Sequence, residues 1–212
     1  GVHSGDSACV IPTFSLAEPV LEKVRRHTES LALKLGVIGL VNIQYAVKGD
    51  EVYVLEANPR GSRTVPFVSK STGVPLAKVA TRVILGEKLA DMSLPAEPAH
   101  PHYTVKEAVL PFSRLPGADT TLGPEMKSTG EVMGVASSFP IAFAKAQAAA
   151  GQALPTKGTF FLSICDADKQ QGVALGRRLH ELGFEIIATS GTAEAMETAG
   201  VPAEPVRKFS EG

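Results

Sequence analysis

Apolar and polar residues follow one another along the chain in short patterns that predict helices interleaved with strands. Residues 16–35 place apolar side chains three or four positions apart, as one buried helix face requires. A capping box at Ser15-Leu16-Ala17-Glu18 predicts the start of this helix, Pro19 falls in its first turn, and Gly36 ends it. Helices are also expected over residues 64–73, 75–85 and 139–150, and strands over 103–110 and 130–136.

The composition shifts at residues 151–158, which we interpret as a linker. A continuous apolar run over 159–164 then predicts a buried parallel strand. A helix over 169–182, a strand over 184–188 and another helix after Thr189 complete the order in which a doubly wound α/β domain begins.

Two apolar-rich runs separated by turn residues (48–50) predict a β-hairpin over residues 40–58. With three residues in the turn, Asn42 lies opposite Glu56 and Gln44 opposite Val54. Gln44 and Glu56 are then diagonal neighbours at roughly 7–8 Å, a span that one cation can bridge.

Gln44, Glu56 and Asn58 share one face of this predicted hairpin, and each carries an oxygen donor. Oxygen ligands are those that a hard cation such as Mg²⁺ or Mn²⁺ prefers. Arg60 and Arg63 follow directly, and guanidinium groups beside a metal suggest phosphoryl transfer. Polar residues on the solvent face of any hairpin and ordinary surface arginines fit the same pattern.

Two further segments have the residue types of an anion site. Near the start of the chain, His3 and Ser4 stand in a glycine-rich turn, where backbone N–H groups can approach a phosphate. Thr189-Ser190-Gly191-Thr192 stands where a strand gives way to a helix, and a helix N-terminus with two hydroxyls can bind an anion. A plain surface turn and plain helix capping are the respective alternatives.

Composition excludes few function classes. The chain has 212 residues, of which 44% are hydrophobic and 20% charged, as is ordinary for a globular protein. The net charge of −1 gives no argument for a nucleic-acid or membrane partner, and no apolar run reaches membrane-spanning length. Cys9 and Cys165 form no metal or redox motif, and we expect each to be a buried free thiol in a reducing cytoplasm.

Several motifs together resemble one family. Gln44 followed by Glu56-Ala57-Asn58-Pro59-Arg60 resembles the metal-binding signature of ATP-grasp ligases. Longer motifs resemble the C-terminal half of carbamoyl phosphate synthetase large subunits, and they cover residues 1–7, 63–70, 72–77 and 123–134. Because the chain opens at Gly1 inside one of these motifs, we expect a fragment that lacks the part of the ATP-grasp unit covering ATP.

The resemblance implies an α/β fold in two parts. Residues 1–151 are expected to form the C-terminal portion of the ATP-grasp, carbamoyl-phosphate-forming domain, an α+β unit with its connecting region. Residues 152–212 are expected to form the start of a methylglyoxal-synthase-like regulatory domain, the beginning of a doubly wound parallel sheet.

The resemblance also implies an activity for the parent protein, the phosphorylation of carbamate by ATP to carbamoyl phosphate. This carbon–nitrogen ligase reaction feeds arginine and pyrimidine biosynthesis, with ammonia supplied by a small glutaminase subunit. Implied cofactors are ATP and Mg²⁺ or Mn²⁺, with K⁺ as a further candidate, and the full-length form is expected to be an oligomer. The isolated fragment is expected to be inactive. The alternatives are another ATP-grasp ligase or carboxylase, and a non-catalytic nucleotide-binding regulatory fragment.

Residue roles carried over from the family fall into five sets. The implied catalytic residues are Arg63 at the reacting carbamate, Arg60 at phosphate or in holding the ligand strand, and His3 at the transferred phosphate. The implied ATP contacts are Gly1, Val2, His3, Ser4, Gln44 and Glu56, and the implied metal ligands are Gln44, Glu56 and Asn58. The implied contacts of an allosteric nucleotide are Lys169, Thr189, Thr192 and Lys208. Asp6 and Glu107 match contacts for ornithine, and each is otherwise an ordinary solvated carboxylate.

Overall fold

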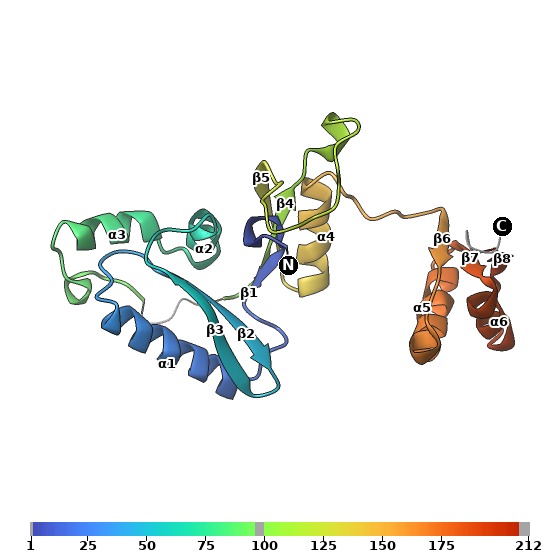
Figure 1. Ribbon diagram of the computed structural model, residues 1–212, viewed down its shortest axis with the longest axis horizontal. Coiled ribbons are helices and arrows are strands. Elements are labelled where there is room, and N and C mark those ends of the chain that lie inside the picture. The colour runs from blue at the N-terminus through green and yellow to red at the C-terminus, as the bar shows by residue number, and fades with distance from the viewer. Residues whose placement is uncertain (1, 96–99, 208–212) are drawn as a thin grey trace. The chain divides into compact units, whose positions relative to one another are not determined.

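The computed structural model describes residues 2–95 and 100–207 and divides into two compact units, Gly1–Leu154 and Pro155–Gly212 (Figure 1). Two residues with predicted roles, Gly1 and Lys208, lie outside the described residues. Both units contain helices as well as strands, so the α/β class predicted from the sequence is confirmed.

Unit 1 contains a three-stranded antiparallel sheet covered by one helix (Figure 1). The strands lie in the order β1 (Cys9–Ile11), β4 (Tyr103–Val109), β5 (Gly130–Ala136). Helix α4 (Phe139–Ala149) packs against β4 and β5. The sheet therefore ties the start of the chain to a strand more than ninety residues later, beginning with the Cys9–Lys106 pair.

Helix and sheet in this unit approach one another at Gly134. A Cβ atom added there would lie 2.1 Å from the carbonyl oxygen of Ala142 and 2.6 Å from the backbone nitrogen of Ala146. Ala142, Ala146 and Val105 are the buried centre of this core. A residue without a side chain is therefore needed at position 134, because the helix backbone occupies the space.

The hairpin consists of β2 (Asn42–Lys48) and β3 (Glu51–Asn58), and its turn is shorter than predicted. Lys48 pairs with Glu51, so that only Gly49 and Asp50 form the turn. The positive φ of 58° at Gly49 suits a two-residue hairpin loop.

A bulge between Gln44 and Tyr45 shifts the register again, so that Gln44 pairs directly with Glu56 and Asn42 with Asn58. The predicted pairings of Gln44 with Val54 and of Asn42 with Glu56 are therefore wrong.

Three helices accompany the hairpin: α1 (Glu18–Lys34), α2 (Val65–Thr72) and α3 (Leu76–Ile84). Their positions agree with the predicted helices, and α1 contacts β3. The predicted capping box is wrong, because Ala17 precedes α1 and no side chain caps it. A proline in the first turn sets the entry of the chain into the helix instead.

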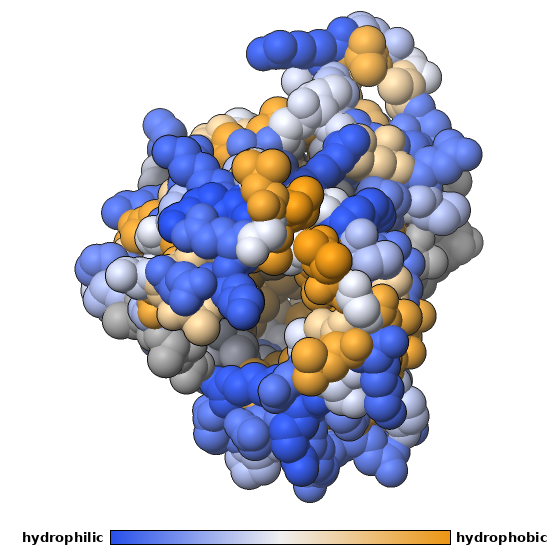
Figure 2. Space-filling model, turned by 90° about the vertical axis from the view of Figure 1, so that its left-hand side faces the viewer, coloured by the Kyte–Doolittle hydropathy of each residue, from blue (hydrophilic) through white to orange (hydrophobic). Residues whose placement is uncertain are grey.

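The apolar stripe predicted for α1 is only partly buried. Val20 is fully buried, whereas Leu16 and Leu35 are exposed. Figure 2 shows apolar side chains gathered on the face of unit 1 that carries α3. Leu33, on α1, and Leu85, directly after α3, are exposed by 74% and 81%.

Unit 2 contains a three-stranded parallel sheet in the order β6 (Thr159–Leu162), β7 (Glu185–Thr189), β8 (Glu204–Val206). The strands are connected through α5 (Lys169–Glu181) and α6 (Ser190–Thr198). This strand–helix alternation is the one predicted, with β8 as an additional strand.

The core of unit 2 forms around Ile186, Met196 and Val201. The parallel strand expected within residues 159–164 is confirmed as β6, but its predicted burial is wrong, because Phe161 is 57% exposed. Among the described strands β6 lies at the edge of this sheet, and its residues alternate between exposed and half-buried.

Short 3₁₀ helices complete the described elements: η1 Ser4–Asp6, η2 Leu89–Asp91, η3 Phe112–Arg114 and η4 Asp166–Asp168. Both cysteines are free, as expected, but Cys9 is half-buried and Cys165 is exposed, so the predicted burial of Cys165 is wrong. Within residues 2–95 and 100–207, no helix has the length and apolar character needed to cross a membrane.

Candidate functional site

A cleft of about 740 Å³ in unit 1 collects most of the residues predicted to contact ATP and metal. It lies between the N-terminal turn, the open end of the hairpin and the loop that follows β3. The lining side chains that carry chemistry are His3, Ser4, Asn42, Gln44, Glu56, Arg60, Arg63 and Glu131. Segments distant in sequence thus converge on one cavity, an arrangement typical of ligand sites.

The three predicted metal ligands stand together at the open end of the hairpin. Gln44 lies directly across from Glu56, and the Asn58 amide donates a hydrogen bond of 2.9 Å to Glu56 Oε1. That bond orients Asn58 and occupies Oε1, so Oε2 is the oxygen of Glu56 that a metal ion would contact. One carboxylate and two amide oxygens fit a hard cation that retains several waters, as Mg²⁺ does.

This donor set differs from a dense carboxylate or histidine cluster. Among the described residues, no group of three or more His, Cys, Asp or Glu side chains is placed to hold a metal. The negative charge of the predicted ligands therefore rests on Glu56.

The two predicted arginines differ in their surroundings. The Arg63 guanidinium contacts the sulfur of Met126 through Nη1. Arg60 turns its guanidinium toward the carbonyl oxygen of Gly61, at 3.1 Å. Both arginines line the cleft and are exposed, so their charges are available to an anionic ligand.

A hydrogen bond within the N-terminal turn fixes the ring orientation of His3 and the tautomer of its neutral form. His3 Nδ1 accepts a hydrogen bond of 2.9 Å from the backbone N–H of Gly5. In the neutral ring the proton then lies on Nε2, which makes that atom the donor. A Cβ atom on Gly5 would lie 2.8 Å from Met126 Sδ, so a side chain at position 5 would force Met126 to move. Val2, the other described member of the predicted ATP set in this turn, is exposed.

Asp6 is buried, contrary to the reading as a solvated carboxylate. Its Oδ2 accepts a hydrogen bond of 2.8 Å from the backbone N–H of Lys127, and its Oδ1 accepts one of 2.8 Å from that of Ser128. Burial alone would raise the pKa of the Asp6 carboxyl, but these hydrogen bonds outweigh it and hold that pKa below its ordinary value.

Glu107, the second predicted ornithine contact, is half-buried on β4. Its Oε2 accepts a hydrogen bond of 2.7 Å from Gln147 Nε2 on α4, and its Oε1 accepts one from the Ala108 N–H. Both predicted ornithine carboxylates therefore already hold internal hydrogen bonds.

Sequence reasoning missed a buried lysine beneath the N-terminal turn. The Lys106 side chain is 1% exposed, and its ammonium lies 3.7 Å from Glu131 Oε1 and 3.5 Å from the carbonyl oxygen of Gly5. A lysine in the middle of β4, between Val105 and Glu107, was the available signal, since long charged side chains are rarely buried without a partner. Cys9 lies nearby, and burial raises the pKa of its thiol, which favours the protonated form.

In unit 2, three of the four residues predicted to bind an effector phosphate lie near the start of α6. Thr189 and Thr192 are buried, and their hydroxyls are 3.2 Å apart. The Lys169 ammonium pairs with Asp166 at 2.7 Å and lies 3.2 Å from the position of a Cβ atom on Gly191.

The Thr192 hydroxyl also has a structural role. It accepts a hydrogen bond of 3.1 Å from the backbone N–H of Ile164 and lies 3.4 Å from the carbonyl oxygen of the same residue. Thr192 therefore ties the end of β6 to α6, in addition to any ligand contact.

Comparison with known proteins agrees with this arrangement. Residues 1–92 match the family model described as carbamoyl-phosphate synthase L chain, ATP binding domain, and residues 171–212 match the MGS-like domain. A crystal structure of an ADP complex of N5-carboxyaminoimidazole ribonucleotide synthetase is similar with a TM-score of 0.50 at 18% identity, covering 66% of this chain and 40% of the other. At that identity the likeness concerns the fold.

Similarity in sequence is much higher to two large chains from different organisms. The chain is 57% identical to the carbamoyl phosphate synthase large chain of Methanoculleus marisnigri over 212 residues, and 56% identical to that of Synechocystis sp. over 213. Each alignment covers 100% of this chain and 20% of the relative. The chain thus belongs to the family of carbamoyl phosphate synthase large chains and corresponds to a fifth of their length.

Proposed function

We propose that the protein carrying this chain phosphorylates carbamate with ATP to give carbamoyl phosphate and ADP, and that the unit 1 cleft contributes contacts to the transferred phosphate. The supporting observation is the convergence of oxygen donors from the hairpin, the Arg63 guanidinium and His3 on one cleft. Membership of a ligase family with an ATP-binding domain supports the same reaction class.

The reaction needs positioning and charge neutralisation more than covalent work by the protein. A carbamate oxygen forms a bond to the γ-phosphorus of ATP, the bond from that phosphorus to the bridging oxygen breaks, and ADP leaves. The charges of reactants and products balance without a proton transfer.

The predicted metal ligands, His3 and the two arginines each have a role in this proposal. Gln44, Glu56 and Asn58 would hold Mg²⁺ or Mn²⁺, which supplies charge neutralisation on phosphate oxygens when bound. His3 Nε2–H would donate to an oxygen of the transferred group. Arg63 would offset the negative charge on the carbamate and phosphoryl oxygens, with Arg60 as a second cation at the phosphate.

The wider assignments follow from the family. We propose a small glutaminase subunit as the ammonia source, a cytoplasmic location, K⁺ as an additional cofactor, and a role in arginine and pyrimidine supply. Unit 2 would bind the phosphate of a regulatory nucleotide through Thr189, Thr192 and Lys169, with Lys208 as a further cation. Asp6 and Glu107 would offer their remaining lone pairs to ornithine.

The test uses the full-length protein that carries this chain. Carbamoyl phosphate formation from ATP, bicarbonate and ammonia is compared between wild type, Arg63→Gln and the control Arg26→Gln, an exposed arginine on α1. Losing one group that stabilises developing charge typically lowers kcat by about 100-fold or more. We expect that loss for Arg63→Gln and rates close to wild type for Arg26→Gln. A wild type that consumes ATP but makes no carbamoyl phosphate contradicts the proposal.

A further inference from the structure

The segment of residues 119–129, between η3 and β5, has no role in the proposed reaction, although it contains most of a long motif noted in the sequence. Three hydrogen bonds donated by backbone N–H groups join it to the N-terminal turn. The His3 N–H donates to the carbonyl oxygen of Gly123 at 2.9 Å, and the N–H groups of Lys127 and Ser128 donate to the two oxygens of Asp6. The segment therefore contacts the residues on both sides of Ser4 and Gly5.

The same segment also reaches the other side of the cleft. Met126 lines the cleft, and its sulfur contacts the Arg63 guanidinium. That sulfur is also the atom that a side chain on Gly5 would strike. Met126 thus lies between the turn that carries His3 and the arginine that follows the hairpin.

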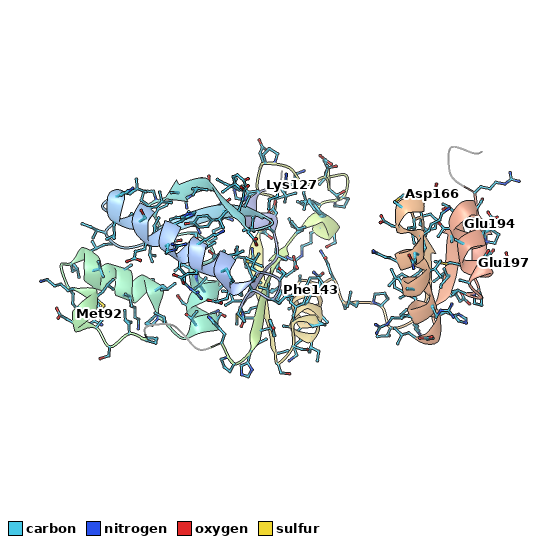
Figure 3. All side chains as sticks on the ribbon, turned by 90° about the horizontal axis from the view of Figure 1, so that it is seen from below. Met92, Lys127, Phe143, Asp166, Glu194 and Glu197 are labelled. Carbon is cyan, nitrogen blue, oxygen red and sulfur yellow. The ribbon has the colours of Figure 1, made fainter. Side chains whose placement is uncertain are left out.

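Lys127 holds the segment in shape. Its ammonium donates to the carbonyl oxygens of Asp119 and Thr121, at 3.0 and 2.7 Å, and lies 3.5 Å from the Asp119 carboxylate. Figure 3 shows Lys127 close to the N-terminal turn. Because Lys127 bonds to residues of its own segment, the segment has a fixed shape and can fix the position of the residues that it contacts.

The carbonyl oxygen of Gly5 attaches the turn both to the same segment and to β4. The carbonyl oxygen of Gly5 accepts from Ser128 Oγ at 3.2 Å and from the buried Lys106 ammonium at 3.5 Å. Hydrogen bonds to charged groups are about twice as strong as neutral ones, and removing one partner leaves the other buried and unsatisfied. The carboxylate of Asp6 is therefore the strongest single attachment of the turn to residues 119–129.

We propose that Asp6 is a positioning residue for phosphoryl transfer: through its carboxylate, residues 119–129 set His3 at a fixed place relative to Arg63. The proposal rests on the reaction proposed above. His3 and Arg63 come from segments that are not neighbours in sequence, and residues 119–129 contact both. A misplacement of about 1 Å in such a group can reduce a rate by about 100-fold.

The first measurement tests the attachment without reference to activity. Amide hydrogen exchange is followed by mass spectrometry in the full-length wild type and in Asp6→Asn. An asparagine retains one acceptor but turns an NH₂ group toward the second backbone N–H. We expect exchange at residues 2–7 and 119–129 to be at least about tenfold faster, with the rest of unit 1 unchanged. Glu125→Gln, which alters an exposed carboxylate of the same segment, should exchange like wild type.

The second measurement tests positioning. Carbamoyl phosphate formation is measured in the absence of ornithine, so that activator binding does not enter. For Asp6→Asn we expect kcat to fall at least about tenfold while the KM for ATP changes less than about threefold, because His3 and Arg63 act on the reacting groups. Ser128→Ala, which removes only the side-chain bond to Gly5, should lower kcat by a smaller factor.

Each other outcome is decisive. Unchanged exchange in Asp6→Asn overturns the attachment, and faster exchange with an unchanged kcat reduces Asp6 to a structural residue. If Asp6→Asn does not fold, a wild-type kcat in Ser128→Ala overturns the proposal. If the wild type forms no carbamoyl phosphate, the proposed function fails and the positioning role fails with it, while the exchange data still decide whether the attachment exists.

Discussion

Gln44 and Glu56 stand directly opposite one another across the β2–β3 hairpin, next to the bulge that separates Gln44 from Tyr45. Directly opposite residues have Cβ atoms about 4.5–5.5 Å apart, closer than the diagonal arrangement expected from the sequence. A single ion can therefore contact both side chains without distortion of the strands.

The first prediction concerns the charge at this pair. Glu56→Gln keeps the size of the side chain but removes the formal negative charge of the predicted ligand set. We expect carbamoyl phosphate formation by the full-length protein to be abolished and Mn²⁺ affinity, measured by calorimetry, to fall at least tenfold. Glu51→Gln, at the turn end of the same strand, should bind Mn²⁺ as the wild type does. A normal rate of carbamoyl phosphate formation by Glu56→Gln at saturating Mg²⁺ would contradict the metal assignment.

A second prediction follows from the position of Gly134 under α4. Gly134→Ala places a methyl group where the helix backbone lies, and overpacking of this kind costs about 1–3 kcal/mol or more. Urea unfolding followed by tyrosine fluorescence should show this loss of stability. The signal reports on unit 1, because Tyr45, Tyr53 and Tyr103 all lie there and the chain has no tryptophan. Gly130→Ala, in the same strand, is the control, since its nearest contact would be an ordinary 3.9 Å. Equal stability of the two variants would contradict the packing described.

Acid should weaken unit 1 through Asp6. Because the pKa of Asp6 is lower in the folded protein than in the unfolded chain, where it is about 3.9, its stabilising effect is full above that value. The effect is lost as the pH falls through the folded-state pKa. Asp6→Asn should therefore be less stable than wild type at pH 7, and the difference should narrow below about pH 4. Acid titration of tyrosine fluorescence measures this, and a constant difference across the range would contradict it.

In unit 2, Thr192→Ala should have two effects. Removing the buried hydroxyl from the Ile164 backbone should lower the free energy of unfolding of unit 2 by about 1–3 kcal/mol. Binding of a nucleoside monophosphate, by calorimetry on the full-length protein, should weaken by about tenfold, since ~1.4 kcal/mol is tenfold. Thr192→Ser should retain both properties, and Thr198→Ala, which changes an exposed hydroxyl of the same helix, should alter neither. Wild-type affinity in a folded Thr192→Ala would leave Thr192 as a structural residue only.

The sequence located the helices and strands well where glycine, proline and apolar period agree. Residues 64–73 and 75–85 are separated by Gly73-Val74-Pro75, and both helices appear within one residue of the expected bounds. The start of α1 was misplaced because Ser15 resembled a cap, whereas Pro19 sets the first turn. The local residue pattern allowed both starts, and only the folded chain distinguishes them.

The shared face of the metal ligands was predicted from a wrong register. The shorter turn shifts the strand pairing by one residue, which alone would have placed Gln44 and Glu56 on opposite faces. The bulge shifts it by one more and restores the common face. A bulge leaves little trace in a pattern of apolar and polar residues, so the direct pairing could not be predicted.

The attachments beneath the N-terminal turn depend on distant partners. Asp6 and Lys127 are 121 residues apart, and Lys106 and Gly5 are 101 apart. Periodicity describes the face on which a residue lies but not the residue that meets it across the fold. The sequence could therefore identify Asp6 as a candidate site residue but not the backbone N–H groups of Lys127 and Ser128 that donate hydrogen bonds to its carboxylate.

The leucines that unit 1 leaves in water bear on how this chain behaves in the laboratory. Leu33 and Leu85 keep most of their surface hydrated, and Figure 2 shows that such side chains are gathered rather than scattered. Gathered apolar surface favours self-association as the protein concentration rises. Light scattering over a dilution series should accompany every titration of the isolated chain, because a signal that follows protein concentration would report assembly instead of ligand.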